Sequence, residues 1–190
     1  MLLHGWPQHW WSWRSVIGPL AERFQVICPD IRGMGWTDAP RAGYDLRTLT
    51  HDLLRLLDVL GHERVRLVGH DWGLLIGYSA CFTAPGRFER FVPMGGVTPW
   101  SAMGAPPLLW LRPWHILLLA SPVGPPLVHA VARNRLHAWR KIGRFSDEET
   151  AAYMAQLGTV ATLARDRQIV RRDIPRFALH APRLRLRVPT

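Results

Sequence analysis

Lysine is nearly absent from this chain of 190 residues, and cysteine is scarce. Of the 24 basic residues all but Lys141 are arginine, and they outnumber the 14 acidic residues to give a formal net charge of +10. No cluster of basic residues is interleaved with aromatic residues in the way that a nucleic-acid-binding groove requires. We therefore interpret the charge as an arginine-rich solvated face and expect no nucleic-acid partner.

The only two cysteines, Cys28 and Cys81, lie far apart in the chain and in apolar segments. This favours buried free thiols over a disulfide and suits a reducing compartment. The first four residues contain neither the basic segment nor the cleavage site of a signal peptide. Together these absences predict a cytoplasmic protein.

A long apolar segment without helix breakers, which a membrane-spanning helix requires, is also missing. The best candidate, residues 113–132, carries no formal charge but contains four prolines and two histidines. Proline at this density breaks a spanning helix, so we expect a buried or lid helix pair and no membrane span. With 48% apolar residues, the chain still has enough for a packed core.

What the sequence does contain is a sharp turn between an apolar run and a helix-like segment. Residues 65–68 lead into Gly-His-Asp-Trp-Gly at positions 69–73, and a helix is predicted over residues 74–84. This is the nucleophile-elbow pattern, with Asp in the place usually held by Ser. Gly69 and Gly73 keep Cβ atoms away from the point where strand and helix nearly touch. Asp71 is therefore the candidate nucleophile, and its alternative role is that of a helix N-cap.

Short apolar strands alternate with helices along the first half of the chain. The pattern predicts strands over residues 1–3, 24–28, 65–68 and 91–94, and helices over residues 8–22, 46–60 and 74–84. The helix over 46–60 has the clearest leucine stripe and should end at Gly61. The alternation implies an α/β fold with a parallel sheet and helices on both faces.

After residue 97 the strand pattern stops. Helices are predicted over residues 108–120, 128–142 and 147–157, the last with a capping box of Ser146 and Glu149. We predict a partial core over residues 1–97, a helical cap over 98–182 and the start of the next core strand over 183–190. Because the sequence opens in the last residues of one strand and stops at the beginning of another, we expect a fragment truncated at both ends.

Three motifs occur in a fixed order, each at an expected strand end. They are His4-Gly5-Trp6-Pro7, then Asp30-x-Arg32-Gly33-x-Gly35-x-Thr37, then residues 69–73. With these motifs the chain resembles the α/β-hydrolase superfamily, in the branch of epoxide hydrolases and haloalkane dehalogenases that use an aspartate nucleophile. The resemblance covers essentially the whole chain and implies the α/β-hydrolase fold, a mostly parallel sheet flanked by helices with a helical cap insertion, here with an incomplete sheet.

The resemblance implies a hydrolase acting through a covalent ester. Asp71 would attack a tetrahedral carbon of a small apolar substrate, and water would then hydrolyse the alkyl-enzyme ester. The backbone N–H groups of Trp6 and Trp72 would stabilise the oxyanion, and their indole rings would wall the pocket or hold a leaving halide. No metal or organic cofactor is implied, and the oligomeric state is left open.

The remaining motif residues are expected to support this site. His4 would orient the Trp6-Pro7 turn, and His70 belongs to the elbow and should point into the sheet. Asp30 and Arg32 would brace their loop against the oxyanion turn by ion pairing and hydrogen bonds. The full supporting set is His4, Gly5, Pro7, Asp30, Arg32, Gly69, His70 and Gly73.

A general base and its acid are not found. Ester hydrolysis needs a histidine oriented by an acid, which in this family follow later strands. The strand after the elbow helix ends in Pro93-Met94-Gly95-Gly96, without a carboxylate. The other histidines considered (His115, His129, His137 and His180) fall in the cap, where surface or packing roles are expected.

The cap tyrosines that protonate the epoxide in epoxide hydrolases are not found either. Ala164 stands where the later tyrosine is expected, and Tyr153 lies a helix away. The leading interpretation is an epoxide-hydrolase-like enzyme on small apolar substrates, with a haloalkane dehalogenase as the alternative. A third hypothesis, from another class, is a catalytically incomplete chain that cannot turn over.

Overall fold

Three parallel strands form the sheet of the computed structural model, which describes residues 1–96, 118, 121, 123–155, 157 and 186–190. Strand β1 spans Leu2–Leu3, β2 spans Val65–His70 and β3 spans Phe88–Met94, in the order β1-β2-β3. The central strand brings Val68 opposite both Leu2 of β1 and Val92 of β3. The predicted parallel sheet is confirmed, with β2 two residues and β3 three residues longer than expected.

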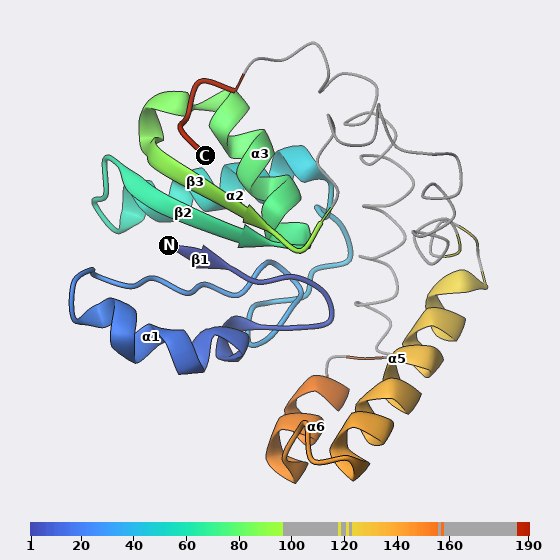
Figure 1. Cartoon of the computed structure of the whole chain (residues 1–190). Coiled ribbons are helices and arrows are strands. Elements are labelled where there is room, and N and C mark those ends of the chain that lie inside the picture. Colours follow the sequence, from blue (N-terminus) through green and yellow to red (C-terminus); the bar gives the residue numbers. More distant parts are fainter. Residues whose placement is uncertain (97–117, 119–120, 122, 156, 158–185) are drawn as a thin grey trace, which may run out of the picture.

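Helices connect these strands and flank the sheet. The 3-10 helix η1 (Trp10–Trp13) and helix α1 (Arg14–Ala21) follow β1, and helix α2 (Leu46–Val59) precedes β2. Helix α3 (Trp72–Thr83) and the 3-10 helix η2 (Pro85–Arg87) lead into β3. In Figure 1, α2 and α3 lie together on one side of the sheet and α1 lies on the other. Helix α3, the predicted elbow helix, begins at Trp72, two residues earlier than predicted.

Helix α2 is the predicted leucine-striped helix. The carboxylate of Asp45 caps its first turn by accepting the Thr48 N–H at 3.0 Å. Leu49, Leu53 and Leu57 are its buried leucines. Gly61 ends the helix with a φ of +71°, and the His62 N–H returns to the Leu57 carbonyl at 2.9 Å, which is a Schellman closure.

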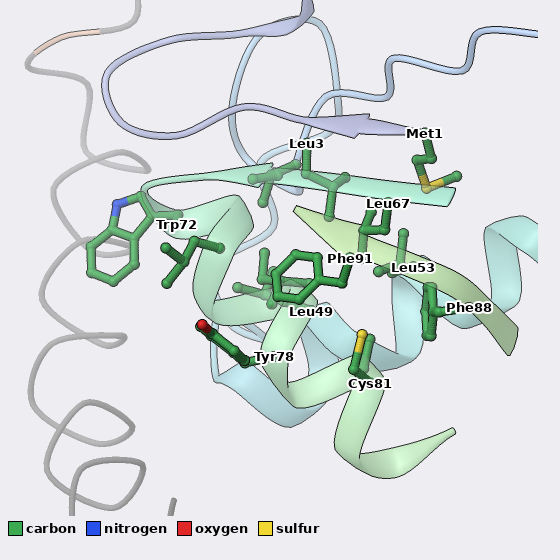
Figure 2. Packing of buried hydrophobic residues seen from close by; sticks show 14 of the residues in the cluster. Met1, Leu3, Leu49, Leu53, Leu67, Trp72, Tyr78, Cys81, Phe88 and Phe91 are labelled. Carbon is green, nitrogen blue, oxygen red and sulfur yellow. The ribbon is translucent and has the colours of Figure 1, made fainter. Parts of the chain in front are cut away.

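The core lies between the sheet and the pair α2 and α3, as Figure 2 shows. The Phe91 ring of β3 meets the Tyr78 ring of α3 edge-on, with 5.1 Å between centroids. Gly77 permits this approach, because a Cβ there would lie 2.5 Å from the Phe91 ring. Cys28 and Cys81 are free thiols, as predicted, but only Cys81 is buried and Cys28 is half-buried. Burial raises the pKa of Cys81 to about 12.

The strand predicted over residues 24–28 is absent from the structure, and the strand start predicted over 183–190 lies partly outside the described residues. Residues 24–28 join β1 through one backbone hydrogen bond, from the Leu2 N–H to the Ile27 carbonyl at 2.8 Å. A two-residue β1 offers too few groups for a regular ladder, so this prediction is wrong. Residues 186–190 form no strand and contribute one such bond, from the Phe91 N–H to the Pro189 carbonyl at 2.9 Å. The helix predicted over 8–22 is shorter as well, since η1 and α1 cover only Trp10–Ala21.

Among the described residues of the predicted cap there are two helices, α5 (Gly124–Lys141) and α6 (Asp147–Met154). The capping box is confirmed, because the Ser146 hydroxyl accepts the Glu149 N–H at 3.1 Å and the Glu149 carboxylate accepts the Ser146 N–H at 2.7 Å. The helix predicted over 108–120 lies almost wholly outside the described residues, so the division at residues 97 and 182 stays a prediction. Among the described helices, none is both long and apolar enough to cross a membrane.

Candidate active site at the elbow

Asp71 sits on the sharp turn between β2 and α3. Its φ of +54° is the only positive value of a non-glycine residue in the described part of the chain. The turn is held on both sides, since the Asp71 N–H donates to the Met94 carbonyl at 3.2 Å and its own carbonyl accepts the Leu74 N–H at 3.0 Å. These bonds fix the residue in a strained conformation at the carboxyl end of the central strand.

Two backbone N–H groups converge on one oxygen of the Asp71 carboxylate. The Trp6 N–H donates to Oδ1 at 2.9 Å, and the Trp72 N–H donates to the same atom at 2.8 Å. Trp6 lies on the turn after β1 and Trp72 opens α3, so two segments far apart in sequence meet here. The first turn of α3 adds a favourable dipole for a negative charge on that oxygen.

The glycines of the motifs are required by close backbone approach. A Cβ on Gly5 would lie 2.2 Å from the Asp71 Cβ and 2.7 Å from Oδ1. A Cβ on Gly69 would lie 2.4 Å from the Gly73 carbonyl oxygen, and one on Gly73 would lie 2.5 Å from the Leu3 carbonyl oxygen. The strand ends and the elbow helix therefore nearly touch, in the way the glycine spacing predicts.

His4 is fully buried and ties the turn after β1 to the next motif. Its Nε2 accepts the Ile31 N–H at 3.0 Å, so the ring proton lies on Nδ1, which donates to the Gly5 carbonyl at 3.0 Å. The same carbonyl accepts the Gln8 N–H at 2.8 Å and closes a turn around the cis Trp6-Pro7 bond. His4 is thus placed to hold the Trp6 N–H toward Asp71.

Asp30 binds backbone N–H groups in η1 and in its own loop. Its Oδ1 accepts the Trp10 N–H at 2.6 Å and its Oδ2 accepts the Trp36 N–H at 2.9 Å. Its Oδ1 also lies 3.6 Å from the His4 Nε2, the atom that accepts the Ile31 N–H. Asp30 therefore fixes its own loop to η1, just beyond the Trp6-Pro7 turn.

Arg32 differs from its predicted role. Its guanidinium pairs with both carboxylate oxygens of Asp52 in α2, at 2.6 and 2.7 Å, and this hydrogen bonding raises the pKa of Arg32. A planar carboxylate that accepts both N–H groups is a better partner than a single carbonyl. Arg32 consequently braces the loop against α2, and the expected ion pairing with the oxyanion turn is wrong for this residue.

The indole rings of Trp6 and Trp72 carry buried N–H groups. In the described part of the chain neither Nε1 has a hydrogen-bond partner, and Trp72 is only 7% exposed. Trp6 packs at 5.5 Å, between ring centroids, against His129 of α5, which is buried. Trp6 also adjoins the apolar cap cluster of Leu136, Tyr153 and Leu157. A site next to Trp6 would thus have an apolar cap wall, and each indole N–H would be available to an acceptor.

A family model described as alpha/beta hydrolase fold matches residues 1–119. The chain belongs to the α/β-hydrolase fold family. It is 52% identical over 90 residues to the soluble epoxide hydrolase of Corynebacterium sp. (strain C12), a match that covers 47% of this chain and 32% of that relative. It is 45% identical over 83 residues to epoxide hydrolase A of Mycobacterium tuberculosis (strain ATCC 25618 / H37Rv), covering 42% and 26%.

Solved structures extend the likeness of this α/β-hydrolase to nearly the whole chain. The epoxide hydrolase CorEH without ligand has a TM-score of 0.79 and 28% identity, covering 99% of this chain and 71% of that one. A putative epoxide hydrolase from Pseudomonas aeruginosa has a TM-score of 0.81 and 26% identity, covering 99% and 68%. The chain thus matches between about a quarter and a third of the length of these curated relatives and about two thirds of these structures.

His9 is a buried residue of this α/β-hydrolase that the sequence analysis missed. It is 0% exposed, and its ring centroid lies 4.9 Å from that of Trp36 and 5.1 Å from that of Tyr153 in α6. Burial lowers the pKa of His9, Arg14 lowers it further and Asp30 opposes them. Neither ring nitrogen has a hydrogen-bond partner among the described residues. A histidine within a tryptophan-rich run gives no periodic signal that would reveal this contact between core and cap.

The other predicted site residues are placed as follows. The His70 ring lies against Gly95 on the turn after β3, since a Cβ on Gly95 would lie 2.4 Å from it. His129 packs as expected and His137 is exposed, whereas His115, Ala164 and His180 lie outside the described residues. Within the described ranges, no three His, Cys, Asp or Glu side chains are grouped to hold a metal ion.

A small cavity of this α/β-hydrolase lies away from the elbow. It has a volume of about 60 Å³ and lies between the loop at residues 29–32 and α2, with a mainly apolar lining that includes Leu53 and Ile76. Asp71 is not part of its lining, and the cavity has room for only a few water-sized molecules. It is therefore a packing defect beside the Arg32–Asp52 pair and not a candidate substrate site.

Proposed function

We propose that this α/β-hydrolase opens small apolar epoxides through a covalent ester on Asp71. The observation that carries the proposal is the convergence of the Trp6 and Trp72 N–H groups on Oδ1. Relatives in sequence and in structure that are named epoxide hydrolases support the same reaction class. Water is the second substrate.

In the first step Oδ2 is the attacking atom, because Oδ1 is occupied by two N–H donors. A bond forms between Oδ2 and an epoxide carbon while the ring carbon–oxygen bond breaks, and the resulting alkoxide takes a proton from an acid. Oδ1 then becomes the carbonyl oxygen of the ester.

In the second step a water molecule, deprotonated by a base, attacks the ester carbonyl carbon. The electron pair moves onto Oδ1, where the two N–H groups already point, and collapse of the intermediate releases the diol with the former Oδ2. Each N–H donor of this kind contributes about 3–4 kcal/mol to stabilising the transition state.

A single turnover in ¹⁸O-labelled water tests this route. The covalent mechanism places the label in the Asp71 carboxylate and leaves the first diol unlabelled, as mass spectrometry of the peptide and the product would show. Direct attack of water on the epoxide would label the diol instead and would overturn the proposal. Styrene oxide is a suitable substrate for the full-length protein.

Asp71→Asn should abolish ester formation, because a neutral amide is a poor nucleophile toward an epoxide carbon. The variant keeps an oxygen at Oδ1 for the two N–H donors, so the fold should be retained. Asp38→Asn is the matched control. It lies at an exposed position just after the Asp30–Thr37 motif and should keep full activity. Normal diol formation by Asp71→Asn would contradict the role of Asp71.

The buried indole N–H groups of Trp6 and Trp72 favour one second candidate, a haloalkane dehalogenase. A leaving halide is an acceptor that both groups could bind, while the same carboxylate attacks the carbon. Assay of the full-length protein on a bromoalkane separates the two candidates. Bromide release without any diol formation from styrene oxide would replace the leading proposal by this one.

A further inference from the structure

Helix α5 carries apolar side chains on a face turned to solvent. Val123, Leu127, Val131, Trp139 and Ile142, on the helix and at its two ends, are exposed by 72%, 53%, 37%, 37% and 68%. The spacing of four between the first three places them on one face. The helix packs against the rest of the molecule with other residues, among them Val128 and Leu136. One apolar face of α5 is thus buried inside the molecule, and the second is exposed to solvent. An exposed apolar face of this kind is typical of a binding surface.

The same segment is strongly basic. Between residues 123 and 144 the sequence holds five cationic residues and no acid: Arg133, Arg135, Arg140, Lys141 and Arg144. Arg140 pairs with Asp147 at 2.7 Å, and Arg133 donates to the Leu157 carbonyl. In the described part of the chain, Arg135, Lys141 and Arg144 form no ion pair. The exposed apolar face is thus bordered by positive charge.

We propose that α5 docks this protein on the surface of an anionic lipid bilayer. The aliphatic side chains of Val123, Leu127 and Val131 would enter the boundary between headgroups and acyl chains, and the flanking cations would meet the lipid phosphates. In Figure 1, α5 lies at the margin of the molecule, away from the sheet. Docking at a surface needs no membrane-spanning helix.

The positive charge and the apolar side chains of the exposed α5 face together disfavour other binding partners. A second copy of the chain would bring two basic segments together, which is repulsive. A nucleic acid would neutralise the charge but would leave Leu127 and Val131 in contact with a polar backbone. An anionic bilayer satisfies both the charge and the apolar side chains.

Vesicle flotation with the full-length protein tests the proposal. We expect binding to vesicles of phosphatidylcholine mixed with phosphatidylglycerol, no binding to phosphatidylcholine alone, and weaker binding as the salt concentration rises. Two variants should each weaken binding about tenfold or more: Leu127→Asp with Val131→Asp, and Arg135→Glu with Lys141→Glu. Circular dichroism checks that both fold, which is expected because the four positions are exposed.

Two controls carry matched changes on α2. Val59→Asp alters a side chain that is 77% exposed, and Arg47→Glu reverses an exposed charge. Both should bind vesicles as the parent does. The proposal is overturned if anionic vesicles do not bind, if the controls weaken binding as much as the α5 variants, or if Leu127→Asp instead dissociates a dimer seen by light scattering.

Discussion

At the scale of single residues, the site depends on an absent side chain as much as on a present one. Asp71 can accept N–H groups from both Trp6 and Trp72 only because nothing extends from Gly5 toward it. The Cβ of any other residue would lie 2.2 Å from the Asp71 Cβ and 2.8 Å from the His70 carbonyl oxygen. The site therefore requires glycine at position 5 as strictly as it requires the carboxylate of Asp71.

Gly5→Ala should destabilise the fold by about 1–3 kcal/mol and abolish ester formation, because the overlap must displace either the turn after β1 or the elbow. Gly18→Ala is the matched control, since a Cβ there meets nothing within 4 Å. In helix α1 the added methyl should stabilise by about 0.5–1 kcal/mol. Urea unfolding measures both changes, and wild-type stability and activity in Gly5→Ala would refute the steric argument.

At the same scale, the sequence predicts the elbow well and the ion pairs poorly. The Gly-x-Asp-x-Gly spacing is a local pattern, and it locates Asp71, Gly69 and Gly73 correctly. The choice of partner for Arg32 is not local, because its partner Asp52 lies in the middle of α2. The leucine stripe predicts that this segment is a helix but not which of its polar side chains faces the loop. Which polar side chain that helix presents to the loop depends on how the helix docks.

At the scale of elements, His9 joins the segment after β1 to helix α6. Its ring contacts the rings of Trp36 and Tyr153, and Arg14 of α1 pairs with Glu149 of α6. The neutral ring fits this aromatic contact, whereas a proton on it would be buried. The facing charges are Asp30, which favours the proton, and Arg14, which opposes it.

Because its folded pKa is lowered by burial, His9 should make the fold sensitive to acid. In the unfolded chain His9 takes up a proton near its ordinary pKa of about 6.5, whereas the folded chain resists protonation. Its contribution is therefore complete above that pH and is lost progressively as the pH falls toward the lower folded pKa. Urea unfolding at a series of pH values between neutrality and mild acid measures this slope.

His9→Phe should flatten that slope while keeping the ring contacts with Trp36 and Tyr153. His51→Phe, at an exposed position of α2, is the control and should leave the slope as in the parent. Hydrogen exchange in α6 adds a local readout, because protonation of His9 should loosen this helix first. An unchanged slope in His9→Phe would show that other groups cause the acid sensitivity.

Element boundaries show where periodicity is informative. The helix over 46–60 has a long stripe and two end signals, so its prediction agrees with α2 within one residue. The strand over 24–28 is apolar in the same way as β2, but strand formation requires a partner of adequate length. Here β1 provides two residues, and only one hydrogen bond reaches the segment. Apolar character therefore identifies a buried segment without settling its pairing.

At the scale of the whole molecule, the described residues provide Asp71, the nucleophile proposed for ester formation, and leave ester hydrolysis without an identified base. Both ring nitrogens of His4 are used by backbone groups, and the His70 ring lies against Gly95. His9 lies within an aromatic cluster. Hydrolysis needs a histidine with a free nitrogen near the ester carbonyl, oriented by an acid.

We therefore expect the 190-residue chain to be alkylated once by styrene oxide and then to stop. Intact-mass spectrometry should show one added substrate mass per chain, located on Asp71 by peptide mapping and absent from Asp71→Asn. Diol should appear at no more than one equivalent, because the two N–H groups on Oδ1 stabilise an oxyanion but cannot remove a proton from water. Continued diol release over many equivalents would show that a base is present after all. In that case His129, which packs on the Trp6 ring at 5.5 Å, is the first residue to replace, by His129→Gln.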